Sequence, residues 1–302
     1  MTTPNRAGPP RPARAGGQPT GEARLLVQCA DRPGIVAAIS TFLAERGANI
    51  IELGQYSSEP DDGRFFLRTV FHLDGLPAVQ SELEQDFGRL AEQLSLQWSF
   101  SRGDQRKRVA IMVSRYDHCL LDLLWRARHN ELKMEPVLVI SNHDDLADAV
   151  RGFDIPFAHI PVNKATKAEA ERRQLELLQG NVDLVVLARY MQILSAGFLA
   201  DVGCPVINIH HSFLPSFMGA NPYAQAKARG VKLIGATAHY ATEDLDEGPI
   251  IEQDVTRVTH ALNAGVLQQR GADVERMVLA RAVAWHCDDR VFRHGNATVV
   301  LR

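Results

Sequence analysis

The chain has 302 residues, of which 45% are hydrophobic and 23% are charged, a composition typical of soluble globular proteins large enough for two domains. The formal net charge of −3 provides no general attraction to nucleic acid. Apolar runs are all shorter than the roughly 20 residues of a membrane span, so no membrane partner is expected. The four cysteines form no CxxC pair, which argues against a disulfide framework and predicts a cytoplasmic protein.

Residues 1–21 differ in composition from the rest of the chain. They contain five prolines, four glycines and no acidic residue. Such a segment cannot bury enough apolar surface to offset its ordering entropy, and it lacks the apolar stretch of a secretory signal. We therefore expect a disordered tail.

Residues 22–101 have the pattern of one small domain. Hydrophobic periodicity and turn residues predict, in order, segments at 24–30 (strand), 35–47 (helix), 49–57 (strand), 64–73 (strand), 79–94 (helix) and 96–100 (strand). The order βαββαβ is typical of a ferredoxin-like fold.

Residues 102–108 are mostly charged and contain no large apolar residue, so we expect a linker there.

From residue 109 to 302, strands and helices alternate. Predicted strands lie at 109–113, 136–140, 157–160, 183–188, 206–209, 233–240 and 249–255, and predicted helices at 120–128, 146–152, 166–179 and 273–287, followed by a closing hairpin. A capping box, Thr166 to Glu169, opens the third helix. This alternation predicts an α/β domain with a doubly wound, mostly parallel sheet.

The second domain holds the residues with the clearest chemical potential. It lacks a GxGxxG fingerprint, a P-loop, an HExxH motif and a GxSxG elbow. Asn208 and His210 lie at the carboxyl end of a predicted buried strand and share a face, His239 lies near the end of another strand, and Asp246 follows in a loop. An amide, an imidazole and a carboxylate beyond strand ends can carry out acyl transfer or hydrolysis.

A metal site is an alternative interpretation of these residues, and Cys204 is a nucleophile in principle. His210, His211, His239 and Asp246 are potential metal ligands, although no pair has a known zinc spacing. Cys204 precedes a strand, at the opposite end of the sheet from the expected site, and we interpret it as structural.

The segment 206–253 resembles the formyltransferase domain that binds formyltetrahydrofolate. The similarity is carried by the Asn-x-His motif of Asn208 to His210 and by the DxGPII run from Asp246 to Ile251. The resemblance implies that Asn208, His210 and Asp246 are catalytic. It also implies that the folate is bound largely by backbone groups near Met191 and Leu194 and along the loop formed by Glu243, Asp244, Leu245 and Asp246, with His239 beside them.

Within that superfamily, the chain is most similar to the formyltetrahydrofolate deformylases. The glycinamide ribonucleotide formyltransferases have a glycine-containing loop after their first strand that holds the acceptor phosphate, whereas residues 113–119 here (VSRYDHC) contain no glycine. His211 also replaces a proline that is usual in the transferases. The resemblance implies hydrolysis of 10-formyltetrahydrofolate by water to tetrahydrofolate and formate, without a metal or other cofactor. This reaction supplies formate for purine synthesis and balances one-carbon folates.

The first domain resembles an ACT domain, with the run from Asp31 to Val36 as its turn into the first helix. This resemblance implies a homo-oligomer and an amino-acid effector, methionine or glycine. Two alternatives stay open at this point: a formyltransferase with an unidentified amine acceptor, and a non-catalytic sensor of folate or amino acids.

Overall fold

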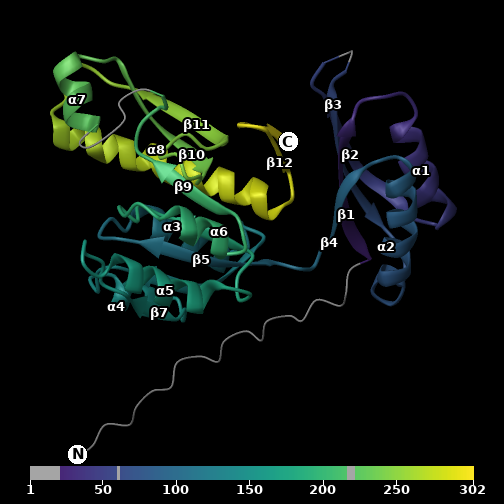
Figure 1. Ribbon diagram of the computed structural model, residues 1–302. Helices are drawn as coiled ribbons and strands as arrows, with labels where there is room; N and C mark the ends of the chain where they lie inside the picture. Colours follow the sequence, from purple (N-terminus) through teal and green to yellow (C-terminus); the bar gives the residue numbers. More distant parts are fainter. Residues whose placement is uncertain (1–20, 60–61, 216–221) are drawn as a thin grey trace, which may run out of the picture. The chain divides into compact units, whose positions relative to one another are not determined.

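The computed structural model describes residues 21–59, 62–215 and 222–302, and they form two compact units whose boundary lies between Gln105 and Arg106 (Figure 1). All of the predicted tail except Gly21 lies outside the described residues. None of the helices in the described ranges is long and apolar enough to cross a membrane.

The first unit is the predicted βαββαβ domain. Its elements are β1 (Glu22–Ala30), α1 (Ile35–Glu45), β2 (Asn49–Ser57), β3 (Arg64–His72), α2 (Leu76–Gln93) and β4 (Gln97–Arg102). Within its described residues the strands form an antiparallel sheet in the order β2-β3-β1-β4. Alternate residues of β1, from Ala23 to Cys29, pack with the apolar faces of α1 and α2 in one core.

The second unit contains the larger sheet. Its elements are β5 (Lys107–Val113), α3 (His118–Arg128), β6 (Met134–Ser141), α4 (Ala147–Arg151), β7 (Phe157–His159), α5 (Lys167–Leu178), β8 (Leu184–Leu187), α6 (Ala196–Asp201), β9 (Val206–His210), α7 (Pro222–Arg229), β10 (Leu233–Tyr240), β11 (Ile250–Arg257), α8 (Ala264–Cys287), β12 (Val291–His294) and β13 (Ala297–Val300).

In the described part of this unit the strand order is β11-β10-β9-β8-β5-β6-β7. Strands β5 to β9 are mutually parallel, whereas β10 is antiparallel to both β9 and β11. Alternate residues of β5 belong to different cores: Ile111 packs with α3 and α8, and Met112 packs with α5 and α6. Helices therefore cover both faces, which confirms the predicted doubly wound sheet, and α8 runs along β10 and β11 (Figure 1).

Three predictions about local structure were wrong. The linker is shorter than 102–108, because β4 extends to Arg102 and β5 begins at Lys107; Arg108 belongs to the strand and pairs with Asp183 at 2.8 Å. The last helix begins at Ala264 rather than near residue 273, with the Asn263 side chain accepting a hydrogen bond from the Val266 amide at 3.0 Å.

The third correction concerns the capping box. Thr166 precedes α5, but its side chain makes no capping bond to the helix. Its hydroxyl instead accepts a hydrogen bond from the Asn163 amide at 3.1 Å, and Glu169 pairs with Arg172. The turn at Asn163 thus competes successfully for the groups that the motif would have used.

Candidate active site

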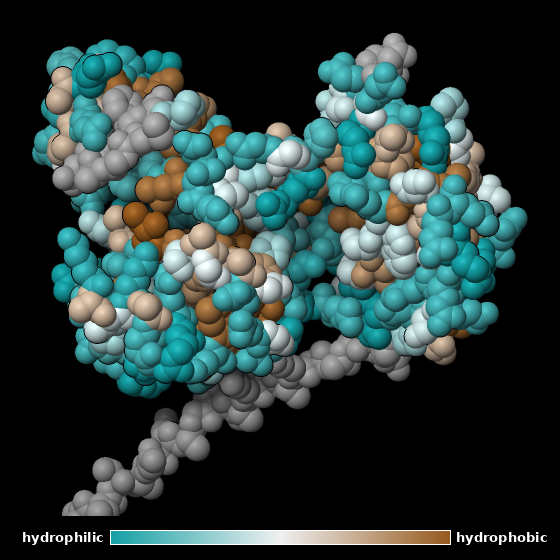
Figure 2. Space-filling view, viewed as in Figure 1, coloured by the Kyte–Doolittle hydropathy of each residue, from teal (hydrophilic) through white to brown (hydrophobic). Residues whose placement is uncertain are grey.

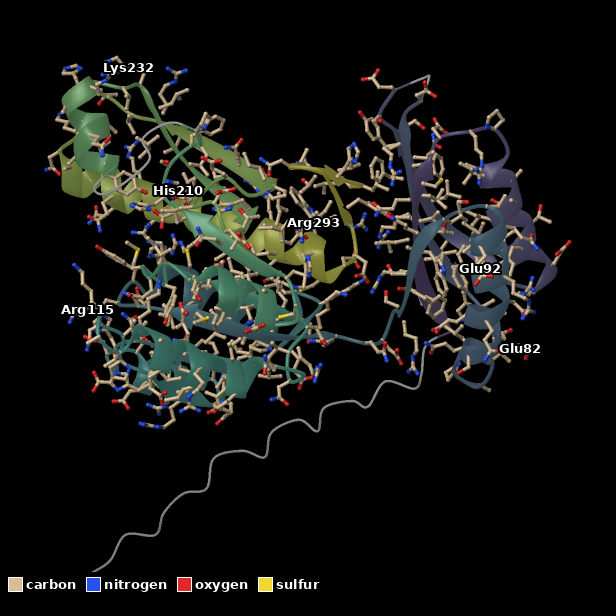
Figure 3. The ribbon with its side chains drawn as sticks, viewed as in Figure 1. Glu82, Glu92, Arg115, His210, Lys232 and Arg293 are labelled. Carbon is tan, nitrogen blue, oxygen red and sulfur yellow. The ribbon has the colours of Figure 1, made fainter. Side chains whose placement is uncertain are left out.

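Strands β9 and β10 place three polar side chains on one face of the sheet. In their antiparallel pairing, Asn208 lies opposite His239 and Thr237 lies opposite His210. Because side chains directly across from each other project to the same face, Asn208, His210 and His239 share it. Figure 3 labels His210 at the end of β9.

The loop between β10 and β11 brings Asp246 to these residues. Asp246 has a positive φ of 60°, an uncommon conformation for a residue other than glycine. Its Oδ1 lies 3.2 Å from His210 Nδ1 and 3.7 Å from His239 Nε2. Gly248 allows the close approach, since a Cβ there would overlap the carbonyl oxygen of Tyr240. The strained loop is therefore held in place around its carboxylate.

The hydrogen bonds define one consistent arrangement of protons. His239 Nδ1 lies 3.0 Å from the Tyr240 carbonyl oxygen and must donate to it, so the neutral ring accepts at Nε2. Asn208 Nδ2 lies 3.1 Å from that nitrogen and donates one of its two N–H groups. The other Asn208 N–H is left for an external acceptor.

His210 has a similar open position. Its Nδ1 faces Asp246, whereas its buried Nε2 has no hydrogen-bond partner among the described residues. Burial alone would raise the pKa of Asp246, but the hydrogen bond from His210 outweighs it and holds that pKa well below the usual range for a carboxyl group. Asp246 is thus an ionised group beside an imidazole with an unused nitrogen.

The residues expected to bind folate by backbone groups lie in two segments. Met191 follows β8 with a positive φ of 55° and is 53% exposed. Leu194 packs its side chain against the core between the sheet and α6. Glu243, Asp244 and Leu245 are exposed immediately before Asp246. The side chains of this second segment therefore make no contribution to the core.

The four potential metal ligands, His210, His211, His239 and Asp246, are not among the groups of described side chains whose ligand atoms lie close enough together to hold an ion. Among the described residues, three potential ligand atoms come within 4.8 Å of one another at His118, Cys119 and Glu275. Burial raises the pKa of the Cys119 thiol well above its ordinary value, so the thiol stays protonated and is a poor ligand. Burial likewise raises the pKa of Cys204 to about 11, in keeping with a structural role.

A second polar cluster, centred on Glu275, was not predicted as such. The Glu275 side chain on α8 is 2% exposed; its Oε1 accepts from the Tyr223 hydroxyl at 2.6 Å, and its Oε2 lies 2.8 Å from His118 Nε2 and 3.5 Å from Arg189 Nε. Burial opposes ionisation, but His118 and Arg189 hold the pKa of Glu275 well below normal. The sequence carried one signal: Glu275 shares a helical stripe with buried Gly271 and Val278.

His211 lies between the two clusters. Its ring centroid is 5.3 Å from that of His210 and 6.1 Å from that of Tyr223. Burial, followed by the positive charge of Arg189, lowers the pKa of His211 to about 4. His211 is therefore neutral at physiological pH and separates the positive charge of Arg189 from the His210–Asp246 pair.

Comparison with known proteins identifies a known family for each of the two units. Residues 107–283 match the family model described as formyl transferase, and residues 23–88 match the ACT domain. Formyltetrahydrofolate deformylase from Mycobacterium tuberculosis (strain ATCC 25618 / H37Rv) is 62% identical, covering 92% of this chain and 90% of its own. The enzyme of that name from Bacillus subtilis is 53% identical, with coverages of 92% and 93%.

A solved structure extends the likeness to three dimensions. The formyltetrahydrofolate deformylase from Pseudomonas syringae pv. tomato superimposes with a TM-score of 0.89 at 48% identity, covering 93% of this chain and 94% of that one. Both domains are included in that overlap. The chain therefore belongs to the formyltetrahydrofolate deformylase family.

Proposed function

We propose that this chain hydrolyses 10-formyltetrahydrofolate to tetrahydrofolate and formate, with Asn208, His210 and Asp246 as its catalytic residues. The observation that supports this most directly is that three chemically distinct groups lie at one place, linked through His239: an amide with a free N–H, an imidazole with an unused nitrogen, and an ionised carboxylate. Family membership supplies the substrate. The reaction needs only folate and water in this proposal, with no metal or redox cofactor.

The exposed apolar surface near the site suits a flat aromatic substrate. Met191 and Ile193 after β8 are 53% and 60% exposed, and Leu245 beside Asp246 is 57% exposed. Figure 2 shows hydrophobic residues gathered in a hollow on this unit. Single exposed apolar residues are common, but several around one polar cluster are typical of a ligand site. We propose that the pterin and its aromatic linker bind there, with backbone groups near Met191, Leu194 and the Glu243–Asp246 loop providing hydrogen bonds.

The chemistry assigns each group a separate task. Asn208 donates its free N–H to the formyl oxygen, on which negative charge develops as water attacks the carbon. His210, through Nε2, assists the oxyanion and carries the proton that water loses. Asp246 is too acidic to keep that proton, so it positions the water and stabilises positive charge on His210. The tetrahedral intermediate then breaks its bond from carbon to N10 as N10 takes up the proton, and formate and tetrahydrofolate are released.

The test uses purified protein, 10-formyltetrahydrofolate and no amine acceptor. We expect equal amounts of tetrahydrofolate and formate, and Asn208→Ala should lower turnover by about 10²–10³ because one oxyanion donor is removed. Asn181→Ala is a matched control, since this amide is exposed and donates to the Leu177 carbonyl within its own turn. Turnover that appears only when amines are added would favour a transferase, and binding of folate without any turnover would favour a sensor.

For the ACT domain we propose an amino-acid effector, methionine or glycine, and pairing between copies of the chain. The family match at residues 23–88 supports a regulatory small molecule in general terms. Measuring deformylase rates with each amino acid, and the mass of the protein in solution, tests both parts. A monomer whose rate neither amino acid changes would refute them.

A further inference from the structure

A cavity of about 330 Å³ lies beside the Glu275 cluster. Tyr116 contributes to its wall from the loop after β5, His118 from the start of α3, Arg189 from the segment after β8, and Gln269 and Glu275 from α8. Its volume is at the lower end of the range for small-molecule sites. The roles proposed above for Asn208, His210 and Asp246 leave this cavity without a function.

Arg189 is the most unusual side chain of the cavity wall. Only 6% of it is exposed, and its Nε and Nη1 have no hydrogen-bond partner among the described residues. The Tyr116 ring covers one face, with the guanidinium carbon 4.9 Å from the ring centroid. The backbone of Arg189 has a positive φ of 65°. A buried guanidinium with unused donors is costly, and this cost indicates a binding role for an anion.

Glu275 determines which anion fits. Its carboxylate lies 3.5 Å from Arg189 Nε, but it is also engaged by His118 and Tyr223, so it balances the guanidinium charge without using the remaining donors. A dianion such as phosphate would be repelled by Glu275 at this short range. A small monoanion can use the free guanidinium N–H while staying on the far side of the carboxylate. A small carboxylate meets these conditions.

The Glu275 cluster, which contributes to the cavity wall, is linked to the catalytic cluster through His211. His211 lies in ring contact distance of His210 on one side and of Tyr223 on the other. We propose that the Arg189 cavity is a binding site for a small carboxylate, and that in the working enzyme this carboxylate is the formate released beside His210. This inference rests on the proposed function for the identity of its ligand. The cavity is larger than formate, so formate enters it together with water and can leave from it.

The test measures formate binding directly, by calorimetric titration of the intact protein without folate. Sodium formate should bind to the wild type, and Arg189→Met should weaken binding at least about tenfold because a charge-assisted hydrogen bond is lost. Gln269→Glu adds a negative charge to the cavity wall at an exposed helical position and should weaken formate binding about threefold without disturbing the fold. Arg115→Met is the control; Arg115 is 69% exposed on the loop after β5 (Figure 3), so its loss should change binding by less than about twofold.

Each outcome bears on a different part of the inference. If Arg189→Met fails to fold, the Gln269→Glu result still decides. Formate binding that neither variant weakens would overturn the site, as would an absence of binding by a protein that hydrolyses 10-formyltetrahydrofolate. Binding of inorganic phosphate but not formate, with the same dependence on Arg189, would overturn the assignment to a carboxylate. Formate binding by a protein that does not hydrolyse the folate would refute the proposed function and leave the carboxylate site standing.

Discussion

Replacing Asp246 by asparagine isolates the charge of the carboxylate from its shape. The amide retains an oxygen that can accept from His210, so the loop should keep its conformation. What is lost is the negative charge 3.2 Å from His210 Nδ1 and 3.7 Å from His239 Nε2. In the proposed reaction, that charge stabilises the positive charge that forms on His210 as water is deprotonated.

The expected loss of activity follows from the distance between the two charges and from the burial of the site. Two unit charges at 3.2 Å interact by about 5 kcal/mol at an effective dielectric constant of about 20. Asp246 retains 12% side-chain exposure, so solvent screens part of this energy. Because the interaction strengthens only as charge develops, about 3–4 kcal/mol should appear in the barrier. We therefore expect Asp246→Asn to lower kcat by about 10²–10³, with KM changed by less than about threefold.

The assay follows release of tetrahydrofolate under single-substrate conditions, with circular dichroism to verify the fold. Glu247→Gln is the matched control, because it removes an exposed negative charge one residue further along the same loop. That variant should retain wild-type kinetics. An Asp246→Asn enzyme that keeps more than a tenth of the wild-type kcat would refute the electrostatic role assigned to Asp246. A large rise in KM with normal kcat would place the residue in substrate binding alone.

Three further outcomes are expected. The pKa of Glu275 is lowered from 4.5 to about 2, so its ionised form stabilises the fold above pH 4.5, and this stabilisation is lost as pH falls toward 2. We therefore expect the difference in free energy of unfolding between wild type and Glu275→Gln, measured in urea titrations, to shrink by about 2 kcal/mol between pH 6 and pH 3. A difference that stays constant over this range would contradict the lowered pKa of Glu275. Gly271→Ala should cost about 1–3 kcal/mol, because the added methyl overlaps the Tyr223 hydroxyl, whereas Gly265→Ala on the same helix should be neutral or stabilising in thermal unfolding. Exhaustive chelation should leave turnover within about twofold of the untreated enzyme, since the site chemistry proposed here relies on acid–base groups alone; loss of activity that zinc restores would contradict it.

Sequence periodicity was sufficient to predict the architecture of both units. Strand β10 was predicted to the residue: Lys232 precedes its apolar run, and polar residues begin at Thr242, shortly after its end. Periodicity did not predict the features of secondary structure that depend on tertiary contacts. Arg108 belongs to β5 because Asp183 lies close enough to pair with it, a partner 75 residues away that no local pattern reveals. Helices α6 and α7, with six and eight residues, were not predicted, whereas the five-residue α4 was, so length alone does not account for the difference.

The candidate site was predictable for a different reason. Asn208 and His210 are two residues apart on one strand, so their common face follows from strand geometry alone. The approach of Asp246 depends on a loop with a positive φ and on Gly248 packing against Tyr240, which spacing alone does not specify. The Glu275 cluster was missed because its members come from elements that are distant in sequence, and a glutamate on a long helix usually faces solvent.

The contacts of the loop after β5 help to explain why water is the acceptor in the proposed reaction. An amine substrate carrying a phosphate would need free backbone N–H groups there. The Ser114 amide instead donates to the Arg189 carbonyl at 3.2 Å, and the Ser114 hydroxyl lies within hydrogen-bond distance of the Tyr190 carbonyl and, at 2.6 Å, of Asn142. His118, at the start of α3, is bonded to Glu275. At this loop, the Ser114 amide and the His118 side chain are thus engaged in positioning Arg189 and Glu275. The same contacts that remove an acceptor site build the cavity proposed for formate, so disrupting Ser114 should affect formate binding before it affects the Asn208–His210–Asp246 chemistry.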